Sequence, residues 1–187
     1  MSFDINKIKI ESDIPEIGRL IDDQYPYQGI NNIRYTARGL IENSKGKFCF
    51  LHIVGEDYFG KRDHLETCGG GLEENEYLDD CLIREVKEEL GYSIKDIKLI
   101  GSILDCYNLI NRITYSTFFH CYIDEDIKLE SNRTDEEQSL IKEVLWLDPL
   151  EALDWLENKS INKCDKLVHA RDKLALRYYL QNYTSIL

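Results

Sequence analysis

The amino-acid sequence predicts one α/β domain in which helices are layered on a sheet. Stretches with the two-residue alternation of strands are interspersed with stretches of helical periodicity. The 187 residues suit a single domain with a sizeable core, and with only three prolines and no linker-like tract nothing marks a second domain. Residues 34–187 are therefore expected to form the domain, and residues 1–33 an extension packed on it.

The first half of the expected domain begins with a hairpin. Strands at 34–42 and 47–55 are joined by the turn sequence NSKG. Residues 56–63 have the composition of a loop, and residues 64–71 read as a short strand that runs into three glycines. A helix follows, with Asn75 as its N-cap, acidic residues in its first turn and Gly91 as its stop signal.

The second half of the domain repeats the mixture of strands and helices. Residues 112–123 alternate apolar side chains with a second set, as a strand does, and Pro149 occupies a position typical of the first turn of a helix. The expected elements are strands at 97–105, 112–123 and 141–148, a long acidic loop at 124–139, and helices at 149–158 and 165–183.

The composition is acidic, with 35 acidic and 23 basic residues and a net charge of −12. This charge argues against binding to a nucleic-acid duplex or to an anionic membrane surface. The sequence has no apolar run of the roughly 18 residues that span a bilayer and no signal-peptide pattern at its start, so a cytoplasmic protein is expected. The six cysteines lack zinc-site spacing, and most lie in apolar runs, where buried free thiols are expected.

The helix near residue 80 turns several carboxylates toward the protein interior. At about 100° per residue, with Leu78 at zero, the apolar arc runs from about 300° through zero to about 120°. Glu85 at about 340° and Glu89 at about 20° fall inside this arc, and Glu88 at about 280° falls at its edge. The solvent side is occupied by Asp80, Arg84 and Lys87. Carboxylates clustered away from water require protonation or positive charge, and Arg84, four residues before Glu88, is expected to compensate only one of them.

A hard divalent cation is the simplest match for an all-carboxylate cluster, so the sequence predicts a site for Mg²⁺ or Mn²⁺. The three consecutive glycines at 69–71 precede this helix, where backbone without Cβ atoms lets a ligand approach closely. They do not form a P-loop, because no Lys-Ser/Thr follows.

The spacing from Gly70 to Tyr92 resembles the signature of the Nudix hydrolases, G-x5-E-x7-R-E-U-x-E-E-x-G-U, in which U is a bulky aliphatic residue. All seven positions with a fixed residue type match, and the departure is Tyr92 in place of the last aliphatic residue. The matching residues are Gly70, Glu76, Arg84, Glu85, Glu88, Glu89 and Gly91, with Val86 at the aliphatic position. The resemblance implies a Nudix-type α/β/α sandwich with a mixed central sheet; it does not explain the extension 1–33.

The resemblance also implies the chemistry: a Mg²⁺-dependent pyrophosphohydrolase that cleaves a phosphoanhydride bond in a nucleoside diphosphate linked to another group. Glu85, Glu88 and Glu89 would bind the metal and carry catalysis, with the Gly69 carbonyl as a candidate further ligand. Gly70, Glu76, Arg84 and Gly91 would support the site, mostly by orienting the loop and the helix. A further glutamate on a loop would act as base or ligand, and the candidates Glu130, Glu136 and Glu137 stay open.

Two alternatives remain open, together with the substrate and a homodimeric state. One is a non-catalytic Nudix-fold module that senses a nucleotide; the other is an enzyme similar to isopentenyl-diphosphate isomerases, in which a cysteine near the position of Cys68 is catalytic. Against the second, the histidine that follows in that branch is missing from TCGGG. Candidates for contact with the base and phosphates are Tyr107, Tyr115, Phe118, Arg38, Lys61 and Arg62.

Overall fold

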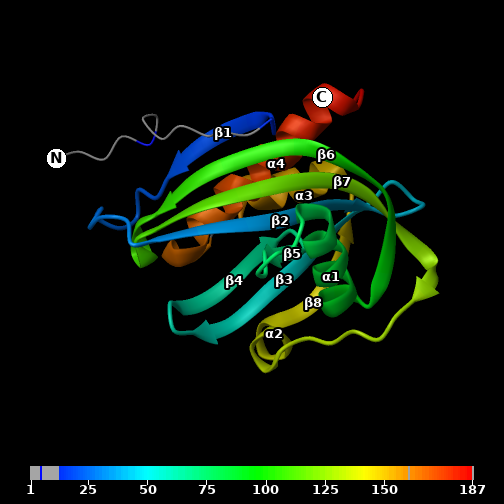
Figure 1. Ribbon diagram of the computed structural model, residues 1–187, viewed down its shortest axis with the longest axis horizontal. Coiled ribbons are helices and arrows are strands. Elements are labelled where there is room, and N and C mark those ends of the chain that lie inside the picture. Colours follow the sequence, from blue (N-terminus) through cyan, green and yellow to red (C-terminus); the bar gives the residue numbers. More distant parts are fainter. Residues whose placement is uncertain (1–4, 6–12, 160, 187) are drawn as a thin grey trace.

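The computed structural model describes residues 5, 13–159 and 161–186 (Figure 1). Within these residues the chain forms a mixed sheet with helices on both faces. The strands are β1 (Glu16–Ile21), β2 (Asn32–Glu42), β3 (Phe48–Asp57), β4 (Gly60–Glu66), β5 (Gly69–Gly71), β6 (Tyr92–Tyr107), β7 (Arg112–Lys128) and β8 (Ile141–Leu147). The helices are α1 (Leu78–Leu90), α2 (Asp135–Leu140), α3 (Pro149–Asn158) and α4 (Lys166–Tyr183), with short 3-10 turns η2 (Asn108–Ile110) and η3 (Lys163–Asp165).

The sheet has the strand order β1-β6-β7-β2-β3-β4, with β5 beside β2 and β8 beside β3. The pairs β1–β6 and β2–β7 are parallel, and the others are antiparallel. β2 and β3 pair at Glu42 with Phe48, next to the predicted turn, and then diverge (Figure 1). The predicted hairpin is thus present at its turn but opens beyond it. The opening separates the half-sheet β1-β6-β7-β2 from the half-sheet β4-β3-β8.

Two apolar layers hold the helices on the sheet. On one face Leu40 and Phe118 pack in a cluster with Leu176 of α4 and with residues of α3. On the other face Ile41 packs with Leu82 of α1. The predicted α/β/α sandwich is therefore confirmed, and the alternation of Leu40 and Ile41 between its two layers is the strand periodicity expected from the sequence.

The prediction of a loop at residues 56–63 is wrong: these residues form the ends of two strands and the turn of a second hairpin. β3 continues to Asp57 and β4 starts at Gly60, whose φ of +115° lies in the left-handed region. The Asp57 carboxylate accepts a hydrogen bond from the Phe59 amide at 2.8 Å. The strands lack apolar alternation here because Asp57 and Arg62 face a polar cavity rather than a core.

The helix α1 starts later than predicted. Its N-cap is Tyr77, and the predicted cap Asn75 has φ +63° and lies in the preceding turn. The Glu76 carboxylate organises that turn by accepting a hydrogen bond from the Glu73 amide at 2.9 Å. The predicted stop is confirmed, because Gly91 is the left-handed C-cap at φ +70° and its amide donates to the Lys87 carbonyl at 3.0 Å.

The acidic stretch 124–139 is only partly a loop. β7 extends to Lys128, and α2 begins at Asp135. A capping box starts α2: the Thr134 hydroxyl accepts from the Glu137 amide at 3.3 Å, and the Glu137 carboxylate accepts from the Thr134 amide at 2.7 Å. This box positions the predicted candidates Glu136 and Glu137 on a helix instead of a loop.

Part of the expected extension 1–33 joins the sheet as the edge strand β1. Residues 1–4 and 6–12 of the extension lie outside the described residues, and its assignment as a unit separate from the domain stays a prediction. All six cysteines are buried and free, as expected. Among the described helices, none is long and apolar enough to span a membrane.

Candidate active site

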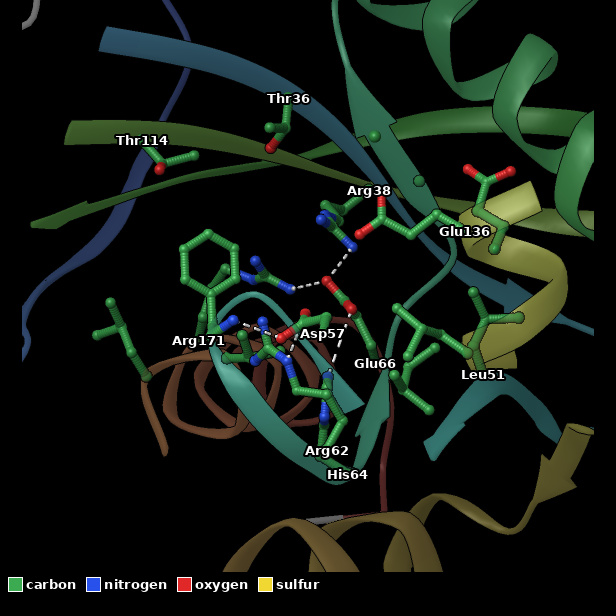
Figure 2. A pocket seen from close by; sticks show the side chains of 18 of the residues that line it. Thr36, Arg38, Leu51, Asp57, Arg62, His64, Glu66, Thr114, Glu136 and Arg171 are labelled. Carbon is green, nitrogen blue, oxygen red and sulfur yellow. Dashed lines mark hydrogen bonds and ion pairs between the residues drawn. The ribbon is translucent and has the colours of Figure 1, made fainter. Parts of the chain in front are cut away.

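A cavity of about 390 Å³ occupies the opening between the two half-sheets. One wall is formed by β2 and β5, the opposite wall by β3 and β4, and α1 and α2 contribute carboxylates. Figure 2 shows Thr36 and Thr114 on strands at one side, a cluster of charged side chains opposite them, and Glu136 on α2. The lining therefore contains many charged side chains, which suits a charged ligand.

Glu85 and Glu89 lie on the inward side of α1, as their helical positions predict. Their exposed fractions are 8% and 7%, and both line the cavity. The Gly69 amide donates a hydrogen bond to the Glu89 carboxylate at 3.0 Å. Burial raises the pKa of Glu89 to about 8 and also raises the pKa of Glu85. Without a cation, Glu89 is therefore largely protonated at neutral pH.

A third carboxylate completes a candidate metal centre. Three carboxylate oxygens lie within 4.8 Å of one another, one from each of Glu85, Glu89 and Glu137. Oxygen ligands of this kind suit Mg²⁺ or Mn²⁺, and a bound cation would offset the cost of ionising the buried Glu89. The residues present thus fit a hard divalent cation. The Gly69 carbonyl as a further ligand stays a prediction.

The glycines of β5 allow α1 to approach the sheet. Gly69 has φ +135°, and a Cβ atom at this position would overlap the Ala37 carbonyl. A Cβ atom at Gly70 would overlap the carboxylate of Glu85 instead. At Gly69, glycine is favoured by the left-handed φ and by the close Ala37 backbone. At Gly70, glycine is favoured by the close approach of the Glu85 carboxylate.

We expect Gly70→Ala to lower kcat/KM about tenfold while reducing stability by less than about 1 kcal/mol. Gly70 lacks a left-handed φ, so alanine adds no backbone strain, and the flexible Glu85 side chain shifts to make room. Steady-state kinetics and thermal unfolding of the variant measure the two effects. An unchanged kcat/KM would show that the position of the Glu85 carboxylate does not matter.

Arg84 contacts more carboxylates than the sequence suggested. The expectation that it compensates one glutamate is wrong: its guanidinium contacts Glu76 at 2.8 Å, Glu85 at 2.8 Å and Glu88 at 3.1 Å. The hydrogen bond to Arg84 lowers the pKa of Glu76 to about 2. Arg84 also donates to the Gly71 carbonyl at 3.1 Å, so it ties the turn, the glycine strand and the helix together.

The remaining predicted acids are placed differently. The Glu88 side chain is about one-third exposed (34%), pairs with Arg84 and does not line the cavity. Of the three candidates left open, Glu136 and Glu137 line the cavity and Glu130 does not. Glu137 is the one that joins Glu85 and Glu89.

Several cavity residues, among them Arg34 and Thr36, were not found from the sequence. Together with the predicted Arg38 they occupy alternate positions of β2 and face the cavity. Their two-residue spacing in RYTAR is a signal that could have shown a polar stripe on this strand. The other cavity residues that were missed are His64, Glu66, Asp105, Arg112 and Arg171.

A buried charge network forms the wall opposite Thr36 and Thr114 (Figure 2). Glu66 forms ion pairs with Arg38 at 2.7 Å and with Arg171 at 3.2 Å, and the neighbouring positive charges hold its pKa well below the usual range despite burial. Burial acts to lower the pKa of His64, but the carboxylates of Asp165 at 3.2 Å and Glu66 at 3.5 Å raise it to about 9. His64 thus adds positive charge to this wall at neutral pH.

Of the aromatic and basic candidates, the structure brings Tyr107, Arg38 and Arg62 to the cavity. Phe118 is in the core, and Tyr115 stacks on Tyr35 at 5.0 Å between ring centroids. Tyr115 and Lys61 do not line the cavity.

Cys68 does not line the cavity either. It is completely buried, and burial raises the pKa of its thiol far above the usual range. A catalytic cysteine requires an accessible thiol of lowered pKa, so the isomerase-like alternative loses its nucleophile.

Comparison with known proteins places this geometry in a family. The family model described as the NUDIX domain matches residues 33–167. The chain belongs to the Nudix family. A search of curated proteins gave no match.

Solved structures show the same Nudix fold at low sequence identity. The crystal structure of the MutT protein from Methanosarcina mazei Go1 is 18% identical with a TM-score of 0.57, covering 85% of this chain and 100% of that one. The Nudix hydrolase from Nitrosomonas europaea is 19% identical with a TM-score of 0.57, covering 81% and 90%. The solution structure of the E. coli ORF135 protein is 18% identical with a TM-score of 0.55, covering 83% and 96%.

Proposed function

We propose that this Nudix protein hydrolyses a phosphoanhydride bond in a nucleoside diphosphate linked to another group, with Mg²⁺ as cofactor and Mn²⁺ as a substitute. The observation that carries the proposal is the group of Glu85, Glu89 and Glu137, whose carboxylate oxygens meet within 4.8 Å at a polar cavity. The retained family signature from Gly70 to Tyr92 supports it, because non-catalytic relatives would be free to lose these glutamates.

The residues of the site have distinct roles in this proposal. Glu85, Glu89 and Glu137 hold the cation, and Glu88, which pairs with Arg84 and does not line the cavity, is a further carboxylate on the same helix. Bound Mg²⁺ would neutralise phosphate charge and lower the pKa of a coordinated water. Arg38, Arg62 and Arg171 are paired with carboxylates of the protein, whereas Arg34 and Arg112 form no ion pair within the described residues and offer positive charge to an anionic substrate.

For the general base we propose Glu136. It lines the cavity, it is exposed, and its side chain makes no ion pair or hydrogen bond within the described residues. In contrast, one carboxylate oxygen of Glu137 accepts a hydrogen bond from the Thr134 amide, and Glu137 belongs to the metal group. A base must be free to accept a proton from water, which favours Glu136 over its neighbour.

The experiment is a nucleotide panel incubated with the pure protein and Mg²⁺. Release of phosphate, pyrophosphate or nucleoside monophosphate is followed, with a parallel incubation in EDTA as control. We expect cleavage of at least one diphosphate-linked nucleotide and its loss in EDTA. Tight nucleotide binding with no turnover of any compound would instead identify a non-catalytic sensing module.

We expect Glu136→Gln to lower kcat at least tenfold and to leave metal affinity within about twofold. Removing a general base costs this much or more, while the metal group keeps all its members. Steady-state kinetics and a Mg²⁺ titration of the variant separate the two effects. A weakened metal affinity with unchanged kcat at saturating Mg²⁺ would make Glu136 a ligand instead.

A further inference from the structure

Five arginines line the cavity, and three of them are matched by carboxylates. The matched pairs, with their nitrogen to oxygen distances, are Arg62–Asp57 (2.9 Å), Arg38–Glu66 (2.7 Å) and Arg171–Asp172 (2.7 Å). The charges of these three arginines are therefore compensated by carboxylates of the protein. The two others, Arg34 and Arg112, differ from them.

Neither the Arg34 nor the Arg112 guanidinium makes an ion pair or a hydrogen bond within the part of the chain that the structure describes. The Nε atom of Arg112 is buried and has no partner. Asp105 also lines the cavity but forms no ion pair with Arg112. Arg34 is exposed and Arg112 is half-buried, so both guanidinium groups are open to pair with an anion that enters the cavity.

The two guanidinium groups belong to one end of the same cavity. β2 and β7 are parallel neighbours in which Arg34 lies opposite Thr114, so Arg112 is two residues earlier on the same face of β7. The Arg34 side chain packs on Gly71, where a Cβ atom would lie 2.7 Å from its Nε. The preceding residue, Gly70, packs against Glu85. Arg34 is thus next to the carboxylate group, and Arg112 extends the positive charge away from it along the sheet.

The electrostatic surroundings of the two arginines support the same interpretation. Desolvation lowers the pKa of each, and so does a neighbouring guanidinium charge, that of Arg38 for Arg34 and that of Arg34 for Arg112. Carboxylates act in the opposite direction, Glu66 and Glu85 on Arg34 and Asp105 on Arg112. Neighbouring guanidinium groups that are not engaged in ion pairs can bind an oxyanion together, and arginine binds phosphate through two parallel hydrogen bonds.

We propose that Arg34 and Arg112 form a second phosphate subsite, which binds a phosphate group of the substrate other than the diphosphate held at Glu85, Glu89 and Glu137. The inference rests on the proposed function and narrows the substrate to nucleotides that carry an additional phosphate beyond the cleaved diphosphate. Thr36 and Thr114, on the same strands, face this part of the cavity and offer hydroxyl groups beside the arginines (Figure 2).

The first test measures anion binding without metal and without turnover. Inorganic pyrophosphate is titrated in EDTA by calorimetry into the native protein, Arg34→Gln, Arg112→Gln and the double variant. The matched control is Lys61→Gln, which removes one positive charge from an exposed position outside the cavity. We expect Kd to rise about tenfold or more in the double variant and less than twofold in the control. Equal affinities in all five proteins would overturn the inference.

Thermal unfolding of the same proteins separates binding from a structural role. Because the two arginines have no partner, their replacement removes uncompensated charge, and the melting temperature in anion-free buffer is expected to stay level or rise. Pyrophosphate should raise the melting temperature of the native protein and not that of the double variant. A double variant that melts earlier and still responds to pyrophosphate would show that the arginines support the fold only.

Kinetics then connect the subsite to the substrate. Pairs that differ by a single phosphate, NADH with NADPH and dephospho-coenzyme A with coenzyme A, are compared in Mg²⁺. We expect kcat/KM to be at least tenfold higher for the member of each pair that carries the extra phosphate. Arg112→Gln should abolish this preference by lowering kcat/KM for that member only. Equal loss on both members would contradict the subsite. Absence of turnover on every compound would contradict the proposed function, while the pyrophosphate titration would still decide the inference.

Discussion

Replacing Glu89 with glutamine is expected to lower kcat/KM at least 100-fold, about 2.7 kcal/mol of transition-state stabilisation. Glutamine keeps the shape of the side chain and can accept the Gly69 hydrogen bond, but it carries no negative charge to hold a cation. Glu85→Gln should act in the same way, because Glu85 is the neighbouring member of the carboxylate group. Initial rates at saturating Mg²⁺ measure both effects.

The matched control for these substitutions is Asp80→Asn, which removes a carboxylate from the exposed side of the same helix. It should change kcat/KM less than twofold. Circular dichroism and size-exclusion chromatography should show all three variants folded. Near-normal rates for Glu85→Gln or Glu89→Gln would remove the assigned metal role from that residue.

The inward carboxylates could be predicted because helical periodicity is local. The positions of Glu85 and Glu89 relative to Leu82 and Val86 follow from 3.6 residues per turn, whatever the rest of the chain does. The Gly91 cap is local in the same sense. The Nudix signature therefore shows one half of the site directly in the sequence.

The other half depends on long-range pairing and could not be predicted. Arg112 and Arg34 meet because β2 and β7 are parallel neighbours, a contact between segments about 80 residues apart. The cavity exists because β2 and β3 separate on the side of the Glu42–Phe48 pair that faces away from the turn, and no residue near the turn predicts this separation. Strand residues with charged side chains are also mistaken for loop residues. The segment with Asp57 and Arg62 has the composition of a loop because these side chains face a polar cavity and not an apolar core.

Without divalent cation, the stability of the protein is expected to fall as the pH rises from about 4.5 to about 8, because of Glu89. Burial raises the pKa of this carboxyl from 4.5 to about 8 in the folded state. The folded protein therefore binds the Glu89 proton more tightly than the unfolded chain does. The resulting stability is complete below pH 4.5 and is lost through pH 8, on the order of 3–5 kcal/mol.

Mg²⁺ should restore much of this loss at pH 8, since a cation stabilises the ionised carboxylate, and its effect should shrink toward pH 5, where the proton competes with it. The Glu89→Gln variant mimics the protonated side chain. It should resemble the native protein at pH 5, exceed its stability at pH 8 in EDTA, and gain little from Mg²⁺.

Urea unfolding at several pH values, with and without Mg²⁺, measures these differences. Comparing native protein and variant cancels the other groups that titrate in this range, among them Asp105, whose pKa is raised to about 6 by burial. If native protein and variant lost stability in parallel between pH 5 and 8, Glu89 would already be ionised in the metal-free fold, and the cation would not be needed to compensate its buried charge. A variant more stable than the native protein yet inactive would show that this carboxylate is kept for catalysis at the expense of the fold.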